Sequence, residues 1–417
     1  MKDVTIFIGY ESFLDDVPAG HSFFPANGGC RIFNYSSEDD AINECRELSK
    51  VMSLKHNVFL TGFSGGKIVI SHRNHHNINR RVFMHEICNA LSQFNGRFLT
   101  GCDLNTSVGD MKLLSGISQK VQPERGFVLA ATELKCDPEE ATAFGVVAAV
   151  QELSEFIEPN FELFTVLFLG IGKVGSHVAT ILDRMPKFQV LVANIHPGRA
   201  CSVVPHAIDL SWTDWTTHIL VPCACSNIID EHVARRITCR GICGSSNIPI
   251  ADEVAMKVIQ RRNILFVHEA ISSAGAVIED SIEYYKPKLF LETHPCYVYS
   301  FIASLVGTKT REFLQKLVEE PDLNSHNAVK HETCITSTHI PVGGRFLDWI
   351  SEYTKTYDVA IMGAGMAGTA CAYNLSKDGY AGSIVLLDQV TVSDQHGSSH
   401  GVTLKLERWH DGWCGWF

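Results

Sequence analysis

The chain has 417 residues, of which 45% are hydrophobic and 19% are charged, as in a globular protein rather than a disordered or fibrous one. Its 46 acidic and 35 basic residues give a net charge of −11, and it contains no basic run, so we expect no nucleic-acid partner. No apolar stretch approaches the ~18 residues that cross a bilayer, so we expect no membrane partner. The 14 cysteines are scattered, which is typical of a reducing compartment, so we expect a cytoplasmic protein.

Residues 1–137 are predicted to form a mixed α/β domain. Ser37 is a typical cap for a helix that runs to Lys55, because apolar residues then recur at spacings of three and four. The same periodicity predicts a second helix over 84–94. A short strand is predicted over 97–100, after an Asn-Gly turn.

The pattern changes after residue 137, where short apolar runs alternate with helical segments. Alternation at this spacing predicts βαβ units and a parallel sheet over residues 138–330. The expected strands are 164–169, 188–193, 218–222 and 264–267. Residues 331–356 are interpreted as a linker, and residues 357–417 as a second, truncated βαβ-like unit. The predicted fold class is therefore α/β, with two domains followed by a partial Rossmann-type unit.

The first glycine fingerprint, Gly170-Ile171-Gly172-Lys173-Val174-Gly175, lies between a predicted strand and a predicted helix. In that context the glycines permit a tight turn, a close approach to a pyrophosphate and close helix packing. This predicts a Rossmann-type dinucleotide site. The acidic residue that usually binds the ribose is replaced by Asn194, and Arg199 lies nearby in sequence. NAD is expected, and NADP stays open.

A second fingerprint, Gly363-Ala364-Gly365-Met366-Ala367-Gly368, is followed at the expected distance by Asp388. The segment resembles the FAD-binding start of the glycine, D-amino acid and sarcosine oxidases. The chain ends at Phe417, too soon for the rest of a flavin domain. Two interpretations stay open, an FAD-like unit and an incomplete module without chemistry.

Two lysines and an aspartate form the most informative set in the sequence. Lys55 ends the first predicted helix, Lys67 follows a Gly-Gly turn, and Asp103 follows a predicted strand. Oxidative deamination of an amino acid needs one ammonium for the substrate carboxylate, one lysine to activate water, and one carboxylate to carry protons. Two ammonium groups in a closed cleft also lower a lysine pKa.

In order and spacing, these residues resemble the glutamate, leucine, phenylalanine and valine dehydrogenases over about residues 20–320. Within that family, Asn95–Thr100 and Asp103-Leu104-Asn105 are most similar to the branch that contains the tryptophan dehydrogenase of scytonemin biosynthesis. The resemblance is carried by Gly28-Gly29, Met52, Lys55, Gly65-Gly66-Lys67, Asp103, Thr142, the first fingerprint, Pro222-Cys223-Ala224 and Ser272-Ser273-Ala274-Gly275.

The resemblance implies an enzyme that oxidises an L-amino acid to its 2-oxo acid and ammonia with NAD(P), acting as a homo-oligomer. Residues 1–137 would hold the substrate and the dimer interface, and a helix near 292–320 would return to that domain. Lys67 and Asp103 would be catalytic. The substrate would contact Lys55, Gly28, Gly29, Met52, Gly101 and Ser273. The cofactor would contact Gly170, Gly172, Lys173, Val174, Gly175, Asn194, Thr142, Cys223 and Ala224.

Several positions depart from the family pattern, including Ser64 for a glycine and Ser273 for an asparagine. Asn27 stands where enzymes for apolar substrates carry an apolar residue. Gly101, where the branched-chain enzymes carry alanine, favours an aromatic or large apolar substrate. The alternative is a catalytically weakened homologue that binds a nucleotide or amino acid as a regulator. The cysteines lack the paired spacing of a zinc site, so no metal is expected.

Overall fold

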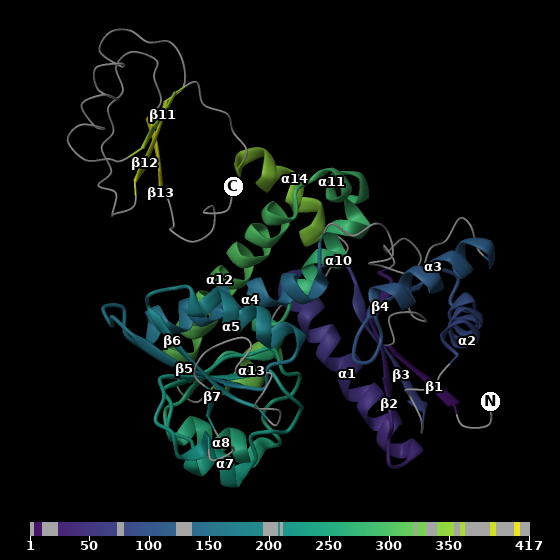
Figure 1. The fold of residues 1–417 in the computed structure, drawn as a ribbon, viewed down its shortest axis with the longest axis horizontal. Coiled ribbons are helices and arrows are strands. Elements are labelled where there is room, and N and C mark those ends of the chain that lie inside the picture. Colours follow the sequence, from purple (N-terminus) through teal and green to yellow (C-terminus); the bar gives the residue numbers. More distant parts are fainter. Residues whose placement is uncertain are drawn as a thin grey trace. The chain divides into compact units, whose positions relative to one another are not determined.

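The computed structural model describes residues 4–10, 24–72, 79–121, 136–194, 207–208, 212–320, 323–330, 340–353, 359–362, 384–388 and 404–408. Two compact units are present, Met1–Leu347 and Asp348–Phe417. The first unit contains two separate sheets and their helices (Figure 1). The predicted α/β fold class is confirmed for this unit.

The first sheet has the strand order β1-β3-β2-β4, and only its edge strand β1 is antiparallel to its neighbour. Its strands are β1 (Val4–Tyr10), β2 (Ala26–Phe33), β3 (Ser64–His72) and β4 (Phe98–Cys102). Three helices accompany them, α1 (Glu38–Phe59), α2 (Arg80–Ser92) and α3 (Val108–Val121). The Ser37 side chain caps α1 by accepting from the Asp40 amide, so the predicted helix start is confirmed.

Strand alternation separates a core face of this sheet from a polar face. Ile32, Ile68 and Ile70 pack into one hydrophobic core with the apolar residues of α2 and α3. Successive strand residues point to opposite faces, so odd-numbered residues of these strands face the other way, where Val69 packs with α1. Lys67 therefore lies on the α1 side of the sheet.

The second sheet is entirely parallel, with the order β10-β9-β8-β5-β6-β7, as the sequence predicted. Its strands are β5 (Phe164–Leu169), β6 (Phe188–Ala193), β7 (Ala207–Ile208), β8 (Ile219–Pro222), β9 (Gly241–Ile242) and β10 (Leu265–Phe266). The helices around it are α4 (Pro138–Ile157), α5 (Lys173–Asp183), α7 (Glu231–Arg236) and α8 (Glu253–Arg261).

A series of helices follows the second sheet. These are α9 (Glu269–Ser272), α10 (Gly275–Tyr285), α11 (Pro287–Glu292), α12 (Pro295–Glu319), α13 (Ser325–Lys330) and α14 (Val342–Tyr353). The helix predicted near 292–320 is α12, which packs along α4. Helix α10 makes two hydrogen bonds to the chain segment after α1. Ser281 Oγ donates to the Thr61 carbonyl oxygen, and Tyr285 Oη donates to the Gly62 carbonyl oxygen, each at 2.7 Å.

The predicted linker over 331–356 is corrected in part, because α14 occupies Val342–Tyr353. The amide of Gly343 donates to Ser281 Oγ at 2.9 Å, and a Cβ on Gly343 would lie 2.0 Å from the Ser281 carbonyl oxygen. Gly343, which belongs to the segment that suggested a linker, instead lets α14 begin against α10.

The second unit contains a parallel three-stranded sheet of order β11-β12-β13. Its strands are β11 (Val359–Met362), β12 (Ile384–Asp388) and β13 (Leu404–Arg408). Asp388 ends β12, as expected, whereas Gly363, Gly365 and Gly368 lie outside the described residues. Among the helices of the described ranges, none is long and apolar enough to cross a membrane.

Candidate active site

A buried ion pair joins two strands that are not neighbours. Lys67 Nζ on β3 lies 2.6 Å from Oδ2 of Asp103, which directly follows β4, and β2 runs between those strands. The two side chains therefore meet over Gly29 of β2, where a Cβ would lie 2.8 Å from Asp103 Cβ. At Gly28 a Cβ would lie 1.7 Å from the Gly66 carbonyl oxygen. Gly29 therefore makes room for the pair, whereas Gly28 lets β2 and β3 approach closely.

Arg31 is a second cation on Asp103, and the sequence did not predict a role for it. Its Nε lies 3.0 Å from Asp103 Oδ2, and its guanidinium also pairs with Glu44, which accepts a hydrogen bond from Tyr35. Burial would raise the pKa of Asp103, but the charges of Lys67 and Arg31 hold it well below its usual range. The carboxylate is therefore ionised. The signal that could have identified Arg31 is its position two residues after Gly29, on the same strand face.

Lys55, on α1, faces residues that follow strands of the second sheet. Its Nζ donates to Asn247 Oδ1 at 3.1 Å and to the Ser273 carbonyl oxygen at 3.4 Å. Burial lowers the pKa of Lys55 to about 8; the negative charge of Glu269 opposes this shift and the positive charge of Lys67 adds to it. The sequence predicted that two neighbouring ammonium groups would lower a lysine pKa, and the charge of Lys67 contributes in this way to the lowered pKa of Lys55. Its hydrogen-bond acceptors are neutral oxygens, which an incoming carboxylate can replace.

Glu269, which the sequence did not identify, organises both acceptors of Lys55. Its side chain is 2% exposed. Its Oε1 accepts from the amide of Ile248, next to Asn247, at 3.0 Å. The backbone carbonyl of Glu269 accepts a hydrogen bond from Ser273 Oγ at 2.8 Å. Ser273 was predicted to contact the substrate, but its hydroxyl group is thus bonded to Glu269, and its carbonyl oxygen accepts from Lys55.

The first fingerprint has the shape that a dinucleotide requires. Gly170 has φ +90°, and a Cβ there would lie 2.7 Å from Ala224 Cβ. At Gly175 a Cβ would lie 2.9 Å from the Gly170 carbonyl oxygen, whereas at Gly172 it would meet no atom within 4 Å. Gly172 begins α5 without a side-chain cap, so the first amides of that helix are available to a phosphate. The residues present therefore fit a pyrophosphate.

The other predicted cofactor residues lie at the start of α5 or on neighbouring elements. The Lys173 ammonium pairs with Glu139 of α4, and Thr142 Oγ1 donates to the Pro138 carbonyl oxygen at 2.9 Å. Asn194 directly follows β6 and is partly exposed. The remaining predicted contacts are at least partly exposed, and these are Val174, Cys223 and Ala224.

Two of the predicted substrate residues, Met52 and Gly101, lie close in the chain to Lys55 and to Asp103. Met52 is partly exposed on α1, one turn before Lys55. Gly101 faces open space, because a Cβ there would meet no atom within 4 Å. Among the described residues no group of three or more His, Cys, Asp or Glu side chains is arranged to hold a metal ion.

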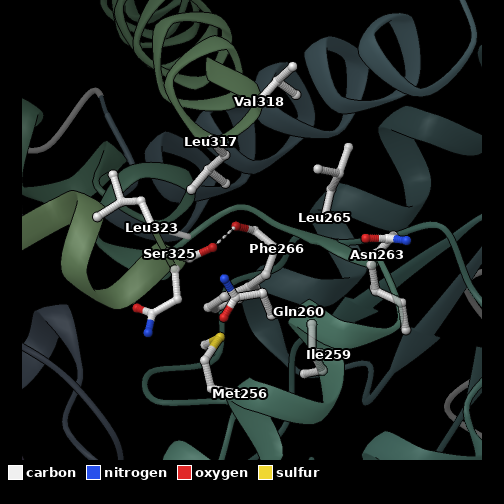
Figure 2. A pocket seen from close by; sticks show the side chains of 12 residues that line it. Met256, Ile259, Gln260, Asn263, Leu265, Phe266, Leu317, Val318, Leu323 and Ser325 are labelled. Carbon is white, nitrogen blue, oxygen red and sulfur yellow. Dashed lines mark hydrogen bonds between the residues drawn. The ribbon is translucent and has the colours of Figure 1, made fainter. Parts of the chain in front are cut away.

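A cavity of about 330 Å³ lies apart from these residues, between α8, the end of α12 and the start of α13. Figure 2 shows its mainly apolar lining and the hydrogen bond from Ser325 Oγ to the Phe266 carbonyl oxygen, at 2.8 Å. None of the predicted catalytic or cofactor residues lines it.

Comparison with known proteins gives consistent results. A family model described as Glutamate/Leucine/Phenylalanine/Valine dehydrogenase matches residues 191–330. A phenylalanine dehydrogenase of Caldalkalibacillus thermarum is 30% identical over 285 residues, which are 63% of this chain and 73% of the relative. The L-tryptophan dehydrogenase of Nostoc punctiforme is 25% identical, over 72% of this chain and 87% of the relative.

Two solved structures share the fold. The crystal structure of the Nostoc punctiforme L-tryptophan dehydrogenase has a TM-score of 0.58 at 18% identity, covering 84% of this chain and 93% of that one. A hetero-hexameric glutamate dehydrogenase from Thermus thermophilus has a TM-score of 0.62 at 16% identity, covering 85% and 90%.

Replacing Glu269 is expected to lower the pKa of Lys55 further. In Glu269→Gln the negative charge that opposes the effect of burial is lost, so the Lys55 ammonium is expected to lose its proton below about pH 8. NMR titration of the protein labelled at lysine Cε measures this, with the Lys55 signal assigned from Lys55→Met. Glu279→Gln is a matched control, since Glu279 is equally buried and is not among the charges that act on Lys55. An unchanged Lys55 titration in Glu269→Gln would contradict the assignment.

Proposed function

The chain belongs to the glutamate, leucine, phenylalanine and valine dehydrogenase family, and from that premise we propose how its residues divide the work of the reaction. The protein is an amino acid dehydrogenase, which converts an apolar L-amino acid to its 2-oxo acid and ammonia with NAD(P). The observation that supports the division of roles is the Lys67–Asp103 pair, set on the same side of the sheet as the buried ammonium of Lys55.

Lys55 binds the substrate carboxylate. Its ammonium is buried, and its hydrogen-bond acceptors among the described residues are the neutral oxygens of Asn247 and Ser273. A carboxylate that enters this position gains a charge-assisted hydrogen bond in a region that excludes water. Because the pKa of Lys55 is about 8, the ammonium persists at neutral pH, and binding weakens as the pH rises above that value.

Asp103 and Lys67 carry the protons. The substrate arrives as an ammonium and must become an amine before its Cα–H bond breaks. Asp103 is ionised and accepts that proton. Lys67 lies against Asp103 at 2.6 Å as an ammonium and must first give its own proton to solvent. As the neutral amine it then takes a proton from the water that attacks the imine carbon, which returns it to the ammonium form. Arg31 positions Asp103 from the opposite direction.

NAD(P) supplies the acceptor for the hydride of Cα. We propose that Gly170, Gly172 and Gly175 with the start of α5 hold its pyrophosphate, and that Asn194 faces the ribose. An asparagine hydrogen-bonds the ribose without repelling a 2′-phosphate, so NAD is proposed and NADP is tolerated. A flavin in the second unit is not proposed, because its three fingerprint glycines lie outside the described residues and the relatives are amino acid dehydrogenases.

The substrate side chain lies over Gly101, and the open space there supports an aromatic or large apolar amino acid. We propose a homo-oligomer; the Thermus thermophilus structure of the same fold is named a hetero-hexamer, which supports the association of several subunits. The competing proposal, a catalytically weakened regulator that binds the same ligands, is disfavoured because all three charged groups are in place. A screen of the twenty L-amino acids with NAD and NADP decides between them, since a regulator would reduce neither cofactor.

Lys67→Ala is expected to abolish turnover while cofactor binding survives, because the lysine lies on the first sheet and the fingerprint on the second. Losing a positioned proton-transfer group costs about 10²–10⁴-fold in kcat. Steady-state kinetics and NADH fluorescence titration measure the two effects, with Lys50→Ala, an exposed lysine of α1, as the control. If Lys67→Ala keeps more than a few percent of kcat, the role is wrongly assigned.

Asn194→Asp is expected to shift the preference toward NAD, because a carboxylate repels a 2′-phosphate and accepts from ribose hydroxyls. The ratio of kcat/KM for NAD to that for NADP measures the shift. Asn194→Gln, which keeps the amide, controls for disturbance of the turn. A ratio that stays the same in Asn194→Asp shows that this side chain does not face the ribose.

Gly101→Ala is expected to reduce activity on aromatic amino acids relative to leucine. One methyl group in a substrate pocket changes discrimination by about 10–200-fold, and the open space at Gly101 means that the variant should fold normally. Activities on tryptophan, phenylalanine, leucine and glutamate are compared in the parent, in Gly101→Ala and in Gly116→Ala, an equally open glycine on α3. Glutamate leading in the parent, or aromatic activity unchanged in Gly101→Ala, would refute this pocket assignment.

A further inference from the structure

Helix α10 places a carboxylate against the face of the first sheet that carries the catalytic pair. Asn27 Nδ2, on β2, donates to Asp280 Oδ2 at 3.1 Å. The neighbouring Ser281 anchors the helix through its 2.7 Å hydrogen bond to the Thr61 carbonyl oxygen. Asp280 is therefore held in place by the backbone of α10 and by one side chain of the sheet.

In this pair, Asn27 Oδ1 and the second carboxylate oxygen of Asp280 have no hydrogen-bond partner among the described residues. Asn27 is fully buried, yet its Oδ1 has no hydrogen-bond partner there. Asp280 is partly exposed, and its only hydrogen bond among the described residues is the one from Asn27. A buried polar atom without a partner is unfavourable, and a ligand that supplies the missing partner removes that cost.

The pair and the open space at Gly101 lie on the same side of the first sheet. Asn27 and Gly29 point to the same side of β2, and Gly29 is the register partner of Gly101 on β4. No atom lies within 4 Å of a Cβ at Gly101. The carboxylate that Asn27 binds therefore lies on the side of the sheet to which Gly101 opens. Burial and, next, the charge of Asp280 raise the pKa of the Cys102 thiol, beside Gly101 in the chain, to about 11.

We propose that Asp280, held by Asn27, selects amino acids whose side chain carries an N–H donor. This inference rests on the proposed function and narrows its substrate class. An indole fills the space over Gly101 and donates its N–H to the free Asp280 oxygen, whereas a phenyl ring leaves that oxygen unpaired. Sites built to hydrogen-bond a substrate group reject analogues that lack it far more strongly than apolar pockets reject a missing methyl group. Lysine and arginine carry the same donor chemistry.

The selectivity is expected to depend on pH in a defined direction. Burial and the charge of Glu283 raise the pKa of Asp280 to about 7, and the hydrogen bond from Asn27 opposes them. The other titratable groups nearby are Glu279 on the same helix and Cys102 on β4. Above about pH 7 the carboxylate accepts only, and below it one oxygen is protonated. Preference for a donor side chain should therefore increase as the pH rises through 7.

The test compares kcat/KM on tryptophan, phenylalanine, lysine, arginine and leucine between pH 6 and 9 in the parent, Asp280→Val and Asp280→Asn. Asp280→Val is expected to lower the tryptophan-to-phenylalanine ratio by at least about tenfold. Asp280→Asn, which keeps an acceptor oxygen, is expected to retain part of the ratio and to lose its pH dependence. Glu292→Gln, an exposed carboxyl group on α11, is the control.

Calorimetric titration with tryptophan and phenylalanine separates this inference from the proposed function. If no amino acid reduces NAD or NADP, the proposed function fails, and the binding ratio still tests Asp280. If lysine or arginine is the best substrate and this preference is lost in Asp280→Val, the proposed selection of N–H donors is supported and the selected side chain is cationic. If kcat/KM and affinity are equal for phenylalanine and tryptophan in the parent, or if their ratio is unchanged in Asp280→Val, the proposed role of Asp280 is overturned.

Discussion

The site depends on the ion pair that Lys67 and Asp103 form across an intervening strand. Two charged groups buried together are stable only when their geometry satisfies both. The Lys67–Asp103 distance is 2.6 Å, and Arg31 completes the carboxylate from the other side. This arrangement requires a strand without a side chain between them, which explains Gly29. Gly29, which the family resemblance assigns to the substrate, therefore also has a structural role, because it lets Lys67 and Asp103 meet.

A second constraint is that Lys55, on a helix that packs against the first sheet, donates its hydrogen bonds to residues that follow strands of the second sheet. Its acceptors are presented by the loop after β9 and by the end of α9, and Glu269 holds both. The charge of Lys55 is thus linked to the packing of residues about two hundred positions away in sequence. Any change in how α9 lies against α1 therefore alters the surroundings of the Lys55 ammonium.

The polar pair of Asn27 and Asp280 distinguishes this pocket from a purely apolar one. Relatives of this chain include phenylalanine, leucine, valine and tryptophan dehydrogenases, so the fold accommodates side chains of different sizes. In the pocket that we propose, Gly101 leaves space for the substrate side chain and Asp280 supplies a hydrogen-bond acceptor. Size and hydrogen bonding would then be controlled by separate elements, β4 and α10.

The sequence by itself determined the α/β class, the parallel second sheet, and the bounds of β5 and β6, because apolar periodicity and glycine turns are local signals. Lys67 and Asp103 were also identified, since their spacing along the chain resembles a known family. Arg31, Glu269 and Asp280 were not identified, because the contacts that give them their roles are with residues distant in sequence, namely Asp103, Ile248 and Asn27. Their importance comes from burial, charge and strand register, which the tertiary structure alone decides. For the same reason, Gly343, in the first turn of α14, resembled part of a linker until its packing against α10 was visible.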